Sequence, residues 1–432
     1  MNDCTIKLHE WDSLTPAAGS PLANRFWQDK SEQETAAVLT QRSILEITEL
    51  KDGLHITSNS YVGKIRIGSM QIDVLPKLEG LPLYRLLKYA YSLSDLQVFS
   101  ESVHDFARFP FFDLLVYQLI LESEALIARG VSQNYVKAQD ELTRPTGRVD
   151  MGRLAHMGGL IANKLPCIYH ERTEDNLLNR VLLAGLHFAL SLVDDRQLKI
   201  KLHRICSILS ESIEARPLTY PYFLQARNSL NRLNSRYEAS ITIIGLLLDS
   251  QGIQLVDENT KISLKGFFFD MNRFFQALLS KLLHEYLDGF DVRDEYRLHS
   301  MFLYLPDGNP QHRRAPTPRP DFAIMRGRNV VCLLDAKYRD LWATPLPRDM
   351  LYQLAIYAVS GKGNAKAKIL YPTMTRGASI QKIAIESPIT GETNAEIILQ
   401  PLFLPELAIL IEEKEHQRVR LTEYMREIVF SC

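Results

Sequence analysis

Cysteine is scarce in this 432-residue sequence, and its few copies form no recognisable pair. The total is odd and no CxxC occurs, which argues against a disulfide framework and against a structural zinc site. His203 and Cys206 form an HxxC, but no second pair completes a zinc-binding set. The five cysteines are Cys4, Cys167, Cys206, Cys332 and Cys432.

Long apolar runs are also missing. The longest, residues 241–248, ends at Asp249 and is far shorter than a bilayer-spanning helix requires. The first residues, MNDCTIKLHE, lack the basic start and apolar stretch of a secretory signal. We therefore expect a cytoplasmic protein without a membrane partner.

Two ready-made functional modules are absent as well. Gly63-Lys64 lacks the upstream glycine of a G-x-x-x-x-G-K-[ST] phosphate loop, and Gly361-Lys362 is followed by Gly363. No C2H2 finger or similar base-reading module is recognisable. The chain therefore supplies neither a phosphate loop of this type nor a base-reading module of this kind.

The hydrophobic pattern predicts an α+β multidomain protein with three regions. Residues 1–130 begin with alternating apolar and polar residues around the Asp52-Gly53 turn and continue with helical spacing, which predicts a β-rich unit followed by helices. Residues 131–250 are expected to be helical. Residues 251–432 read as helix, three strands, helix and strand, which predicts an α/β core with a central mixed sheet flanked by helices.

The candidate catalytic residues lie in the segment RPDFAIMRGRNVVCLLDAKY. Asp335 and Lys337 lie two apart in an apolar strand, so their side chains leave the same face. If a hairpin is centred on Arg328, Asp321 lies opposite Asp335. Facing carboxylates repel, and a divalent cation resolves the conflict. We expect Asp321 and Asp335 to bind Mg²⁺, with Mn²⁺ able to substitute, and to hold it against a phosphate. Lys337 would then lie beside the water that attacks this phosphate.

Basic residues surround this acidic pair. Residues 311–339 contain seven Lys/Arg against two acids, although the whole chain has a net charge of −1. Such a local imbalance favours a bound polyanion. We expect double-stranded DNA to contact the arginines of this stretch, namely Arg313, Arg314, Arg319 and Arg339.

These residues resemble the PD-(D/E)xK nucleases of the RecB branch. Asp321, the Asp335-Ala336-Lys337 triplet and a following QxxxY occur in the order and spacing of that superfamily. The resemblance implies that Gln353 and Tyr357, one turn apart on a helix, support the metal site. Many of these nucleases add a helix glutamate.

Here Gln276 stands where that glutamate is expected, and its amide oxygen can still be a metal ligand. Glu285, on the same helix, is the alternative, although nine residues place it on a different face.

Most of the chain also resembles the McrC family, the nuclease subunits of McrBC-type modification-dependent restriction systems. The segments that carry this resemblance are VGKIRIGSMQIDVLPKL, ERTEDNLLNR, LNSRYEAS and DMNRFF. The family glutamate that follows the last segment again corresponds to Gln276. The resemblance implies that the N-terminal domain inserts into a ring of the AAA+ GTPase McrB and stimulates its hydrolysis, while the C-terminal domain cuts DNA in anti-phage defence.

Two other functions stay open. The chain could be a stand-alone PD-(D/E)xK nuclease, although about 250 residues outside the core exceed what a small nuclease needs. It could also be a non-cutting GTPase-activating subunit with a weakened nuclease site, which Gln276 favours and the presence of Asp321, Asp335, Lys337 and Gln353 opposes.

Overall fold

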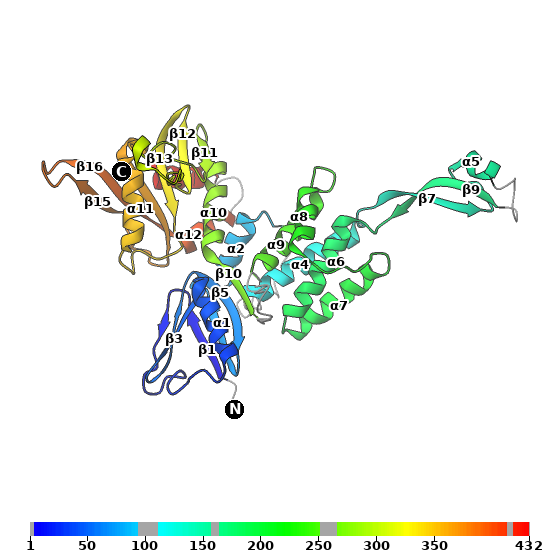
Figure 1. Ribbon diagram of the computed structural model, residues 1–432, viewed down its shortest axis with the longest axis horizontal. Helices are drawn as coiled ribbons and strands as arrows, with labels where there is room; N and C mark the ends of the chain where they lie inside the picture. The colour runs from blue at the N-terminus through cyan, green and yellow to red at the C-terminus, as the bar shows by residue number, and fades with distance from the viewer. Residues whose placement is uncertain (1–3, 94–110, 157–163, 251–265, 413–417, 432) are drawn as a thin grey trace. The chain divides into compact units, whose positions relative to one another are not determined.

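The computed structural model describes residues 4–93, 111–156, 164–250, 266–412 and 418–431 (Figure 1). The chain is a mixed α/β protein that forms two compact units, Met1–Phe111 with Ser250–Cys432, and Phe112–Asp249. These units do not coincide with the three regions expected from the sequence. The N-terminal and C-terminal regions share one unit because they share a sheet.

That shared sheet has the order β1-β6-β5-β10. Strands β1 (Cys4–His9), β5 (Tyr61–Ile67) and β6 (Met70–Leu75) come from the N-terminal region, whereas β10 (Gly266–Asp270) comes from the C-terminal one. β10 runs antiparallel to β5, with Gly63 opposite Phe268. Gly63 has φ +152°, and a Cβ there would lie 1.9 Å from the Phe267 carbonyl oxygen, so this close pairing needs a glycine.

A second, smaller sheet completes the expected β-rich region. It has the order β2-β4-β3, with β2 at Ser13–Leu14, β3 at Leu45–Leu50 and β4 at Gly53–Ser58. Helix α1 (Lys30–Gln41) packs beside these strands, and α2 (Gly80–Ala90) follows them in the chain. The core buries Ile6, Leu39, Ile56, Ile65 and Ile72 together with Phe268 of β10.

The C-terminal sheet is mixed and has six strands in the order β11-β12-β13-β14-β16-β15. β13 (Asn329–Ala336), β14 (Lys366–Thr373) and β16 (Thr393–Phe403) are parallel, whereas β11 (Asp291–Asp294), β12 (Phe322–Arg326) and β15 (Gln381–Glu386) pair antiparallel. The short turns η2 (Pro306–Gly308) and η3 (Lys362–Ala365) lie in its connections.

Helices cover both faces of this sheet. On one face, α11 (Arg348–Val359) buries Leu354, Tyr357 and Ala358 against Leu333 and Ile369. On the other face lies α13 (Arg418–Phe430). The buried Lys368 of β14 contacts the end of this helix, where its Nζ donates to the Ile428 carbonyl at 2.7 Å and the Ser431 carbonyl at 2.9 Å. Helices α10 (Met271–Tyr286) and α12 (Leu404–Glu412) also belong to this part (Figure 1).

The second unit combines helices with a sheet that the sequence did not predict. Its helices are α4 (Phe111–Ala128), α6 (Leu177–Leu192), α7 (Arg196–Ser210), α8 (Tyr220–Asn228) and α9 (Glu238–Ser250), with a short η1 (Ser235–Tyr237). Its sheet has the order β7-β9-β8, from β7 (Asn134–Leu142), β8 (Arg148–Val149) and β9 (Leu165–Thr173), with α5 (Met151–His156) between the strands.

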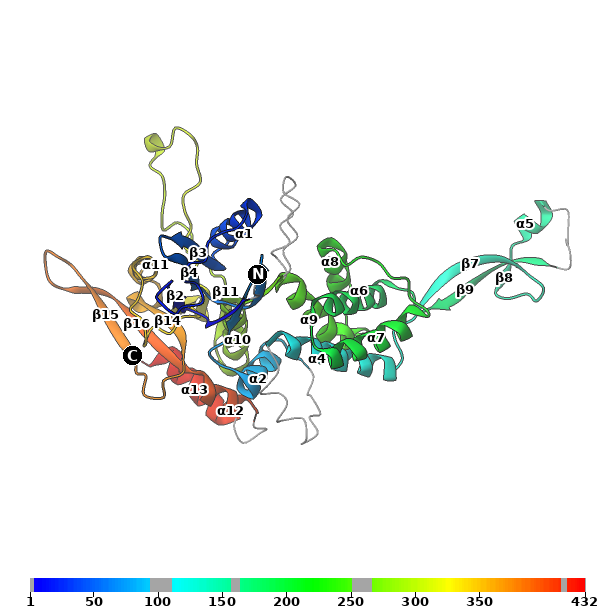
Figure 2. The same cartoon turned by 90° about the horizontal axis from the view of Figure 1, so that it is seen from below.

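The expectation of a helical middle region was therefore wrong for the strands β7, β8 and β9. β7 and β9 form a long antiparallel hairpin that projects from the helices of its own unit (Figure 2). The residues of β7 are almost all exposed, so the strand lacks the alternation of apolar and polar residues that marks a half-buried strand. Without that signal, the polar sequence reads as a connection.

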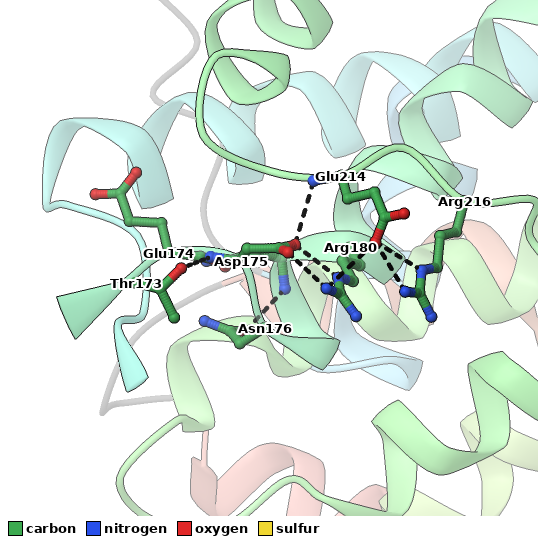
Figure 3. Close-up of polar contacts among 8 residues, drawn as sticks. Thr173, Glu174, Asp175, Asn176, Arg180, Glu214 and Arg216 are labelled. Carbon is green, nitrogen blue, oxygen red and sulfur yellow. Dashed lines mark hydrogen bonds and ion pairs between the residues drawn. The ribbon is translucent and has the colours of Figure 1, made fainter. Parts of the chain in front are cut away.

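The sequence ERTEDNLLNR forms the base of this hairpin. Arg180 donates through Nε and Nη2 to the two carboxylate oxygens of Asp175, at 2.6 and 2.5 Å, and Glu214 approaches the same guanidinium (Figure 3). Asn176 caps α6 by accepting from the Asn179 N–H. This part of the McrC-like sequence therefore fixes the end of β9 to the helices.

None of the described helices is long and apolar enough to cross a bilayer.

Candidate active site

The β12–β13 hairpin sets the two aspartates opposite each other, but by a different route from the expected one. Arg326 pairs with Asn329, so the turn is Gly327-Arg328 and is not centred on Arg328. Between Ile324 and Met325 the register shifts by one residue, and Phe322 then pairs with Leu334. Asp321 precedes Phe322 and Asp335 follows Leu334, so this bulge restores the facing positions that the sequence predicted.

Asp321 is held from three sides. Its Oδ2 accepts the Ala336 backbone N–H at 2.8 Å, and its Oδ1 accepts from Gln276 Nε2 at 3.1 Å. Its backbone carbonyl accepts the Glu295 N–H at 2.6 Å. Burial raises the pKa of Asp321 more than the Ala336 hydrogen bond and the Lys337 charge lower it. The carboxylate is therefore fixed in place, but its charge is poorly compensated.

Asp335 is only 1% exposed, and its charge is compensated even less. Lys337 Nζ lies 3.0 Å from Oδ2 as an ion pair, yet neither Asp335 oxygen accepts a well-formed hydrogen bond from a described residue. Burial, and then the charge of Asp321, raise the pKa of Asp335 to about 6. Buried carboxylates whose charge is poorly compensated are costly, so this pair of aspartates suits a cation.

Lys337 supplies positive charge to the same patch. Burial lowers the pKa of its ammonium, but the carboxylates of Asp335 and Asp321 together raise it further, and the net pKa lies above the ordinary value. Asp349, in the first turn of α11, adds to this effect. Lys337 therefore stays charged beside the two aspartates.

Gln353 and Tyr357 hold the backbone that leads to Asp321. Gln353 Nε2 donates to the Tyr357 hydroxyl at 2.7 Å, and that hydroxyl donates to the Arg319 carbonyl at 3.0 Å. Burial raises the pKa of Tyr357 to about 12, so the hydroxyl keeps its proton. The pair thus fixes the backbone two residues before Asp321.

Comparison with known proteins gives this arrangement a family. The sequence model described as "McrBC 5-methylcytosine restriction system component" matches residues 56–372. The chain belongs to this family. The McrC-like resemblance stated from the sequence is thereby confirmed. No curated protein matches the chain.

Two solved structures resemble this McrBC-family chain. One is a chain of the "Refined half-complex from tetradecameric assembly of Thermococcus gammatolerans McrB AAA+ hexamers with bound McrC", with a TM-score of 0.63 and 20% identity over 98% of this chain and 100% of the other. At this identity the likeness shows the fold alone. The second, from the Thermococcus gammatolerans McrBC complex, has a TM-score of 0.46 and 21% identity over 67% of this chain and 90% of the other.

The structure separates the two candidates for a third ligand on α10 of this McrBC-family protein. Gln276 reaches Asp321, whereas Glu285 does not reach the site and instead accepts from the Tyr89 hydroxyl at 2.5 Å. Nine residues are two and a half turns, which points Glu285 away from Asp321. Among the described residues, no group of three or more His, Cys, Asp and Glu could hold a metal ion.

The four arginines expected to contact DNA lie in different environments. Arg313 and Arg314 are exposed in the loop between β11 and β12. Arg319 forms an ion pair with Glu295 beside Asp321. Arg339 is directed elsewhere, because its guanidinium lies over the Trp11 ring, 5.1 Å from the ring centroid.

Sequence reasoning missed several residues that shape the site. Glu295 pairs with Arg319, and its charge acts on Asp321. Asn272 lies one turn before Gln276 on α10 and accepts the Tyr338 backbone N–H at 3.1 Å. The spacing of Asn272 and Gln276 was a usable signal for α10, because residues four apart share a helix face. Nothing local in the sequence marks Glu295.

Proposed function

We propose that this chain is the nuclease subunit of a McrBC-type restriction system, in which a PD-(D/E)xK site hydrolyses DNA phosphodiester bonds with Mg²⁺. One observation carries the proposal. Asp335 is buried without a well-formed hydrogen bond from the described residues, opposite Asp321 and 3.0 Å from Lys337. Burying such a carboxylate lowers the stability of the fold. Buried carboxylates with raised pKa values are typical of functional sites.

The residues present fit a hard divalent cation. Asp321 and Asp335 would hold Mg²⁺ or Mn²⁺, and the Gln276 amide, which now donates to Asp321, could turn its oxygen toward the cation. When bound, the metal supplies charge stabilisation for the phosphate and lowers the pKa of a water. Lys337 orients that water or stabilises the developing negative charge, while Gln353 and Tyr357 keep the segment before Asp321 in place.

DNA would approach along the loop of residues 296–320. Four arginines against one aspartate give this loop a charge of +3 (4 − 1) with its histidines neutral. Its base is closed by the Leu298 N–H donating to the Pro318 carbonyl at 2.9 Å, three residues before Asp321. Replacing Arg313 and Arg314 by Gln should weaken binding to all DNA sequences and lower the salt slope by about 0.9 for each phosphate that an arginine no longer neutralises.

A motor partner completes the proposed system. The structural relative described above contains McrC bound to McrB AAA+ hexamers, and we extend that arrangement to this chain. The proposed partner is an AAA+ GTPase ring resembling McrB, whose hydrolysis this chain stimulates. Residues 1–130 are the proposed contact region.

The β7–β9 hairpin offers a second contact surface. Tyr135 is 68% exposed and Val136 is 53% exposed, on opposite faces of β7, so this projecting strand presents a large apolar side chain on each face to a partner. Changing both residues to Ser should weaken binding to the ring if this surface is used. Variants on the exposed face of residues 30–41 would test the N-terminal region in the same assay.

The test of the whole proposal is Asp335→Ala in the complete assembly. Cleavage of DNA should disappear, whereas binding to the ring and stimulation of its GTPase should persist, because Asp335 serves the metal. Cleavage that survives this substitution would exclude the proposed site. A full-length, folded wild-type protein that cuts DNA without any motor would instead support a stand-alone nuclease.

A non-cutting GTPase-activating subunit is the second candidate. The observation in its favour is that Gln276 places an amide where the family has a carboxylate, so the described part of the chain offers this site two acids and no third. The wild-type protein would then stimulate the ring and leave DNA intact at every Mg²⁺ or Mn²⁺ concentration. Metal-dependent cutting would remove this candidate.

A further inference from the structure

Lys337 lies just beyond the regular part of its strand, so its position depends on what holds its neighbours. β13 ends at Ala336, and the Lys337 N–H donates to the Leu370 carbonyl at 3.1 Å. The next residue, Tyr338, is buried, and its N–H donates to a side chain instead of to a neighbouring strand. Whatever fixes Tyr338 therefore fixes the backbone that carries the Lys337 ammonium.

Every polar group of Tyr338 is held by a residue far away in the sequence. Its backbone N–H donates to Asn272 Oδ1 at 3.1 Å, and its carbonyl accepts from Trp11 Nε1 at 2.6 Å. Its hydroxyl donates to Glu10 Oε1 at 3.1 Å. Trp11 and Glu10 belong to the N-terminal β-rich region, 327 and 328 residues before Tyr338.

The two N-terminal residues occupy positions that cost stability. Glu10 is 1% exposed, its Oε2 has no hydrogen-bond partner among the described residues, and burial raises its pKa. Trp11 has φ +61°, a left-handed conformation that is strained for a bulky side chain. Such costs persist only where the surroundings impose them, and strained, poorly compensated groups cluster at functional sites.

Helix α10 ties the same N-terminal sheets to the other side of the site. Asn272 Nδ2 donates to Ser60 Oγ at 2.7 Å, and the Met271 N–H donates to the Ser60 carbonyl at 3.0 Å. One turn later, Gln276 donates to Asp321. The N-terminal region thus reaches Lys337 through Tyr338 and Asp321 through α10.

We propose that Glu10 and Trp11 are positioning residues of the nuclease site, which fix Tyr338 and through it hold the Lys337 ammonium against Asp335. This inference rests on the proposed nuclease function. The N-terminal region is then part of the cleavage machinery as well as a candidate contact for the partner. A displacement of about 1 Å in a catalytic group can lower a rate about a hundredfold, so loosening Tyr338 should be measurable.

The first test compares Trp11→Phe with Trp27→Phe. Both substitutions keep an aromatic ring, but only the first removes the N–H that holds the Tyr338 carbonyl; Trp27 packs against the core of the N-terminal sheets. In the full chain assembled with its motor, Trp11→Phe should lower the single-turnover cleavage rate at saturating Mg²⁺ by about tenfold or more. The Mg²⁺ midpoint, the affinity for the ring and the melting temperature should match those of Trp27→Phe.

The second test needs no cleavage. Hydrogen exchange in the peptide of residues 335–341 should be faster in Trp11→Phe than in the wild type and in Trp27→Phe. Glu10→Gln should behave like the wild type in both tests, because its amide oxygen can accept the Tyr338 O–H and the Lys77 N–H that Glu10 Oε1 now accepts. Glu10→Leu should lose rate and protection.

The outcomes separate the two proposals. If hydrogen exchange in residues 335–341 and the cleavage rate are both unchanged in Trp11→Phe, the positioning role is overturned. It is also overturned if the melting temperature and the affinity for the ring fall together with the cleavage rate. If the wild type cuts no DNA, the proposed nuclease function fails by itself. Exchange in residues 335–341 still decides whether Trp11 and Glu10 hold this segment.

Discussion

Asp335→Asn should stabilise the metal-free protein at neutral pH, although it removes a proposed metal ligand. The substitution keeps the size of a side chain that is 1% exposed and removes a charge that is poorly compensated. The pKa of Asp335 is raised from an ordinary value of 3.8 to about 6, chiefly by burial and then by Asp321, after the opposing attraction of Lys337. The folded protein therefore favours the protonated acid.

The sign and size follow from this rise. Between about pH 4 and pH 6 the folded state binds more protons at Asp335 than the unfolded state does, so the free energy of unfolding falls as the pH rises. A rise of the pKa from 3.8 to about 6 amounts to about 3 kcal/mol, at about 1.4 kcal/mol for each pH unit. Asn does not titrate, so the variant should exceed the wild type by up to about 3 kcal/mol at pH 7.5 and by little near pH 4.

Urea unfolding in EDTA at several pH values measures this difference. The three tryptophans, Trp11, Trp27 and Trp342, all belong to the unit that contains the site, so their fluorescence follows that unit alone. Taking the difference between variant and wild type at each pH cancels the titration of other groups. A wild type as stable as the variant at pH 7.5, or a difference independent of pH, would refute the reasoning. Excess Mg²⁺ should reverse the order, because only the wild type gains by binding it.

Three other substitutions test neighbouring contacts. Gln276→Glu should lower the melting temperature in EDTA and enlarge the rise caused by Mn²⁺, since it adds a carboxylate next to Asp321; an unchanged rise would place Gln276 outside the metal site. Tyr357→Phe should cost about 1–3 kcal/mol in urea unfolding by leaving the Arg319 carbonyl without its donor, and an unaltered midpoint would contradict this. Lys368→Met should cost a similar amount by leaving two carbonyls at the end of α13 unpaired, with faster hydrogen exchange there; unchanged exchange would argue that they find other donors.

The local elements of the fold could largely be predicted from the sequence. The β-rich start and the succession of helix, three strands, helix and strand through β14 follow from hydrophobic periodicity, which reports directly on which face is buried. The later elements β15, β16, α12 and α13 were not predicted. The strand β7 could not be predicted this way, since its residues are mostly exposed and their pattern carries no burial signal. Pairing between distant strands was equally inaccessible: nothing near Gly63 identifies residues 266–270 as its neighbours.

In the candidate site, too, local patterns predict some positions, whereas contacts between distant residues determine others. The facing positions of Asp321 and Asp335 follow from counting along one hairpin, and the count succeeded because a bulge at one end compensated for a misplaced turn at the other. The contact between Gln353 and Tyr357 follows from the helical repeat, whereas their place beside the site was implied only by the resemblance to the PD-(D/E)xK nucleases. Glu10 and Trp11 are not evident from any local pattern, because their role depends on contacts with a residue more than 300 positions away.

These long-range contacts change how the functions of this chain can be separated. From the sequence, removal of the β-rich segment through Leu78 is expected to leave a C-terminal domain that still binds Mg²⁺. The structure argues otherwise, because that deletion removes β5, exposes the buried Phe268 of β10 and frees Tyr338 from Glu10 and Trp11. Loss of metal binding in such a truncation would therefore say little about the metal ligands. Point substitutions that keep the sheets intact, such as Trp11→Phe, can distinguish partner binding from cleavage where a deletion cannot.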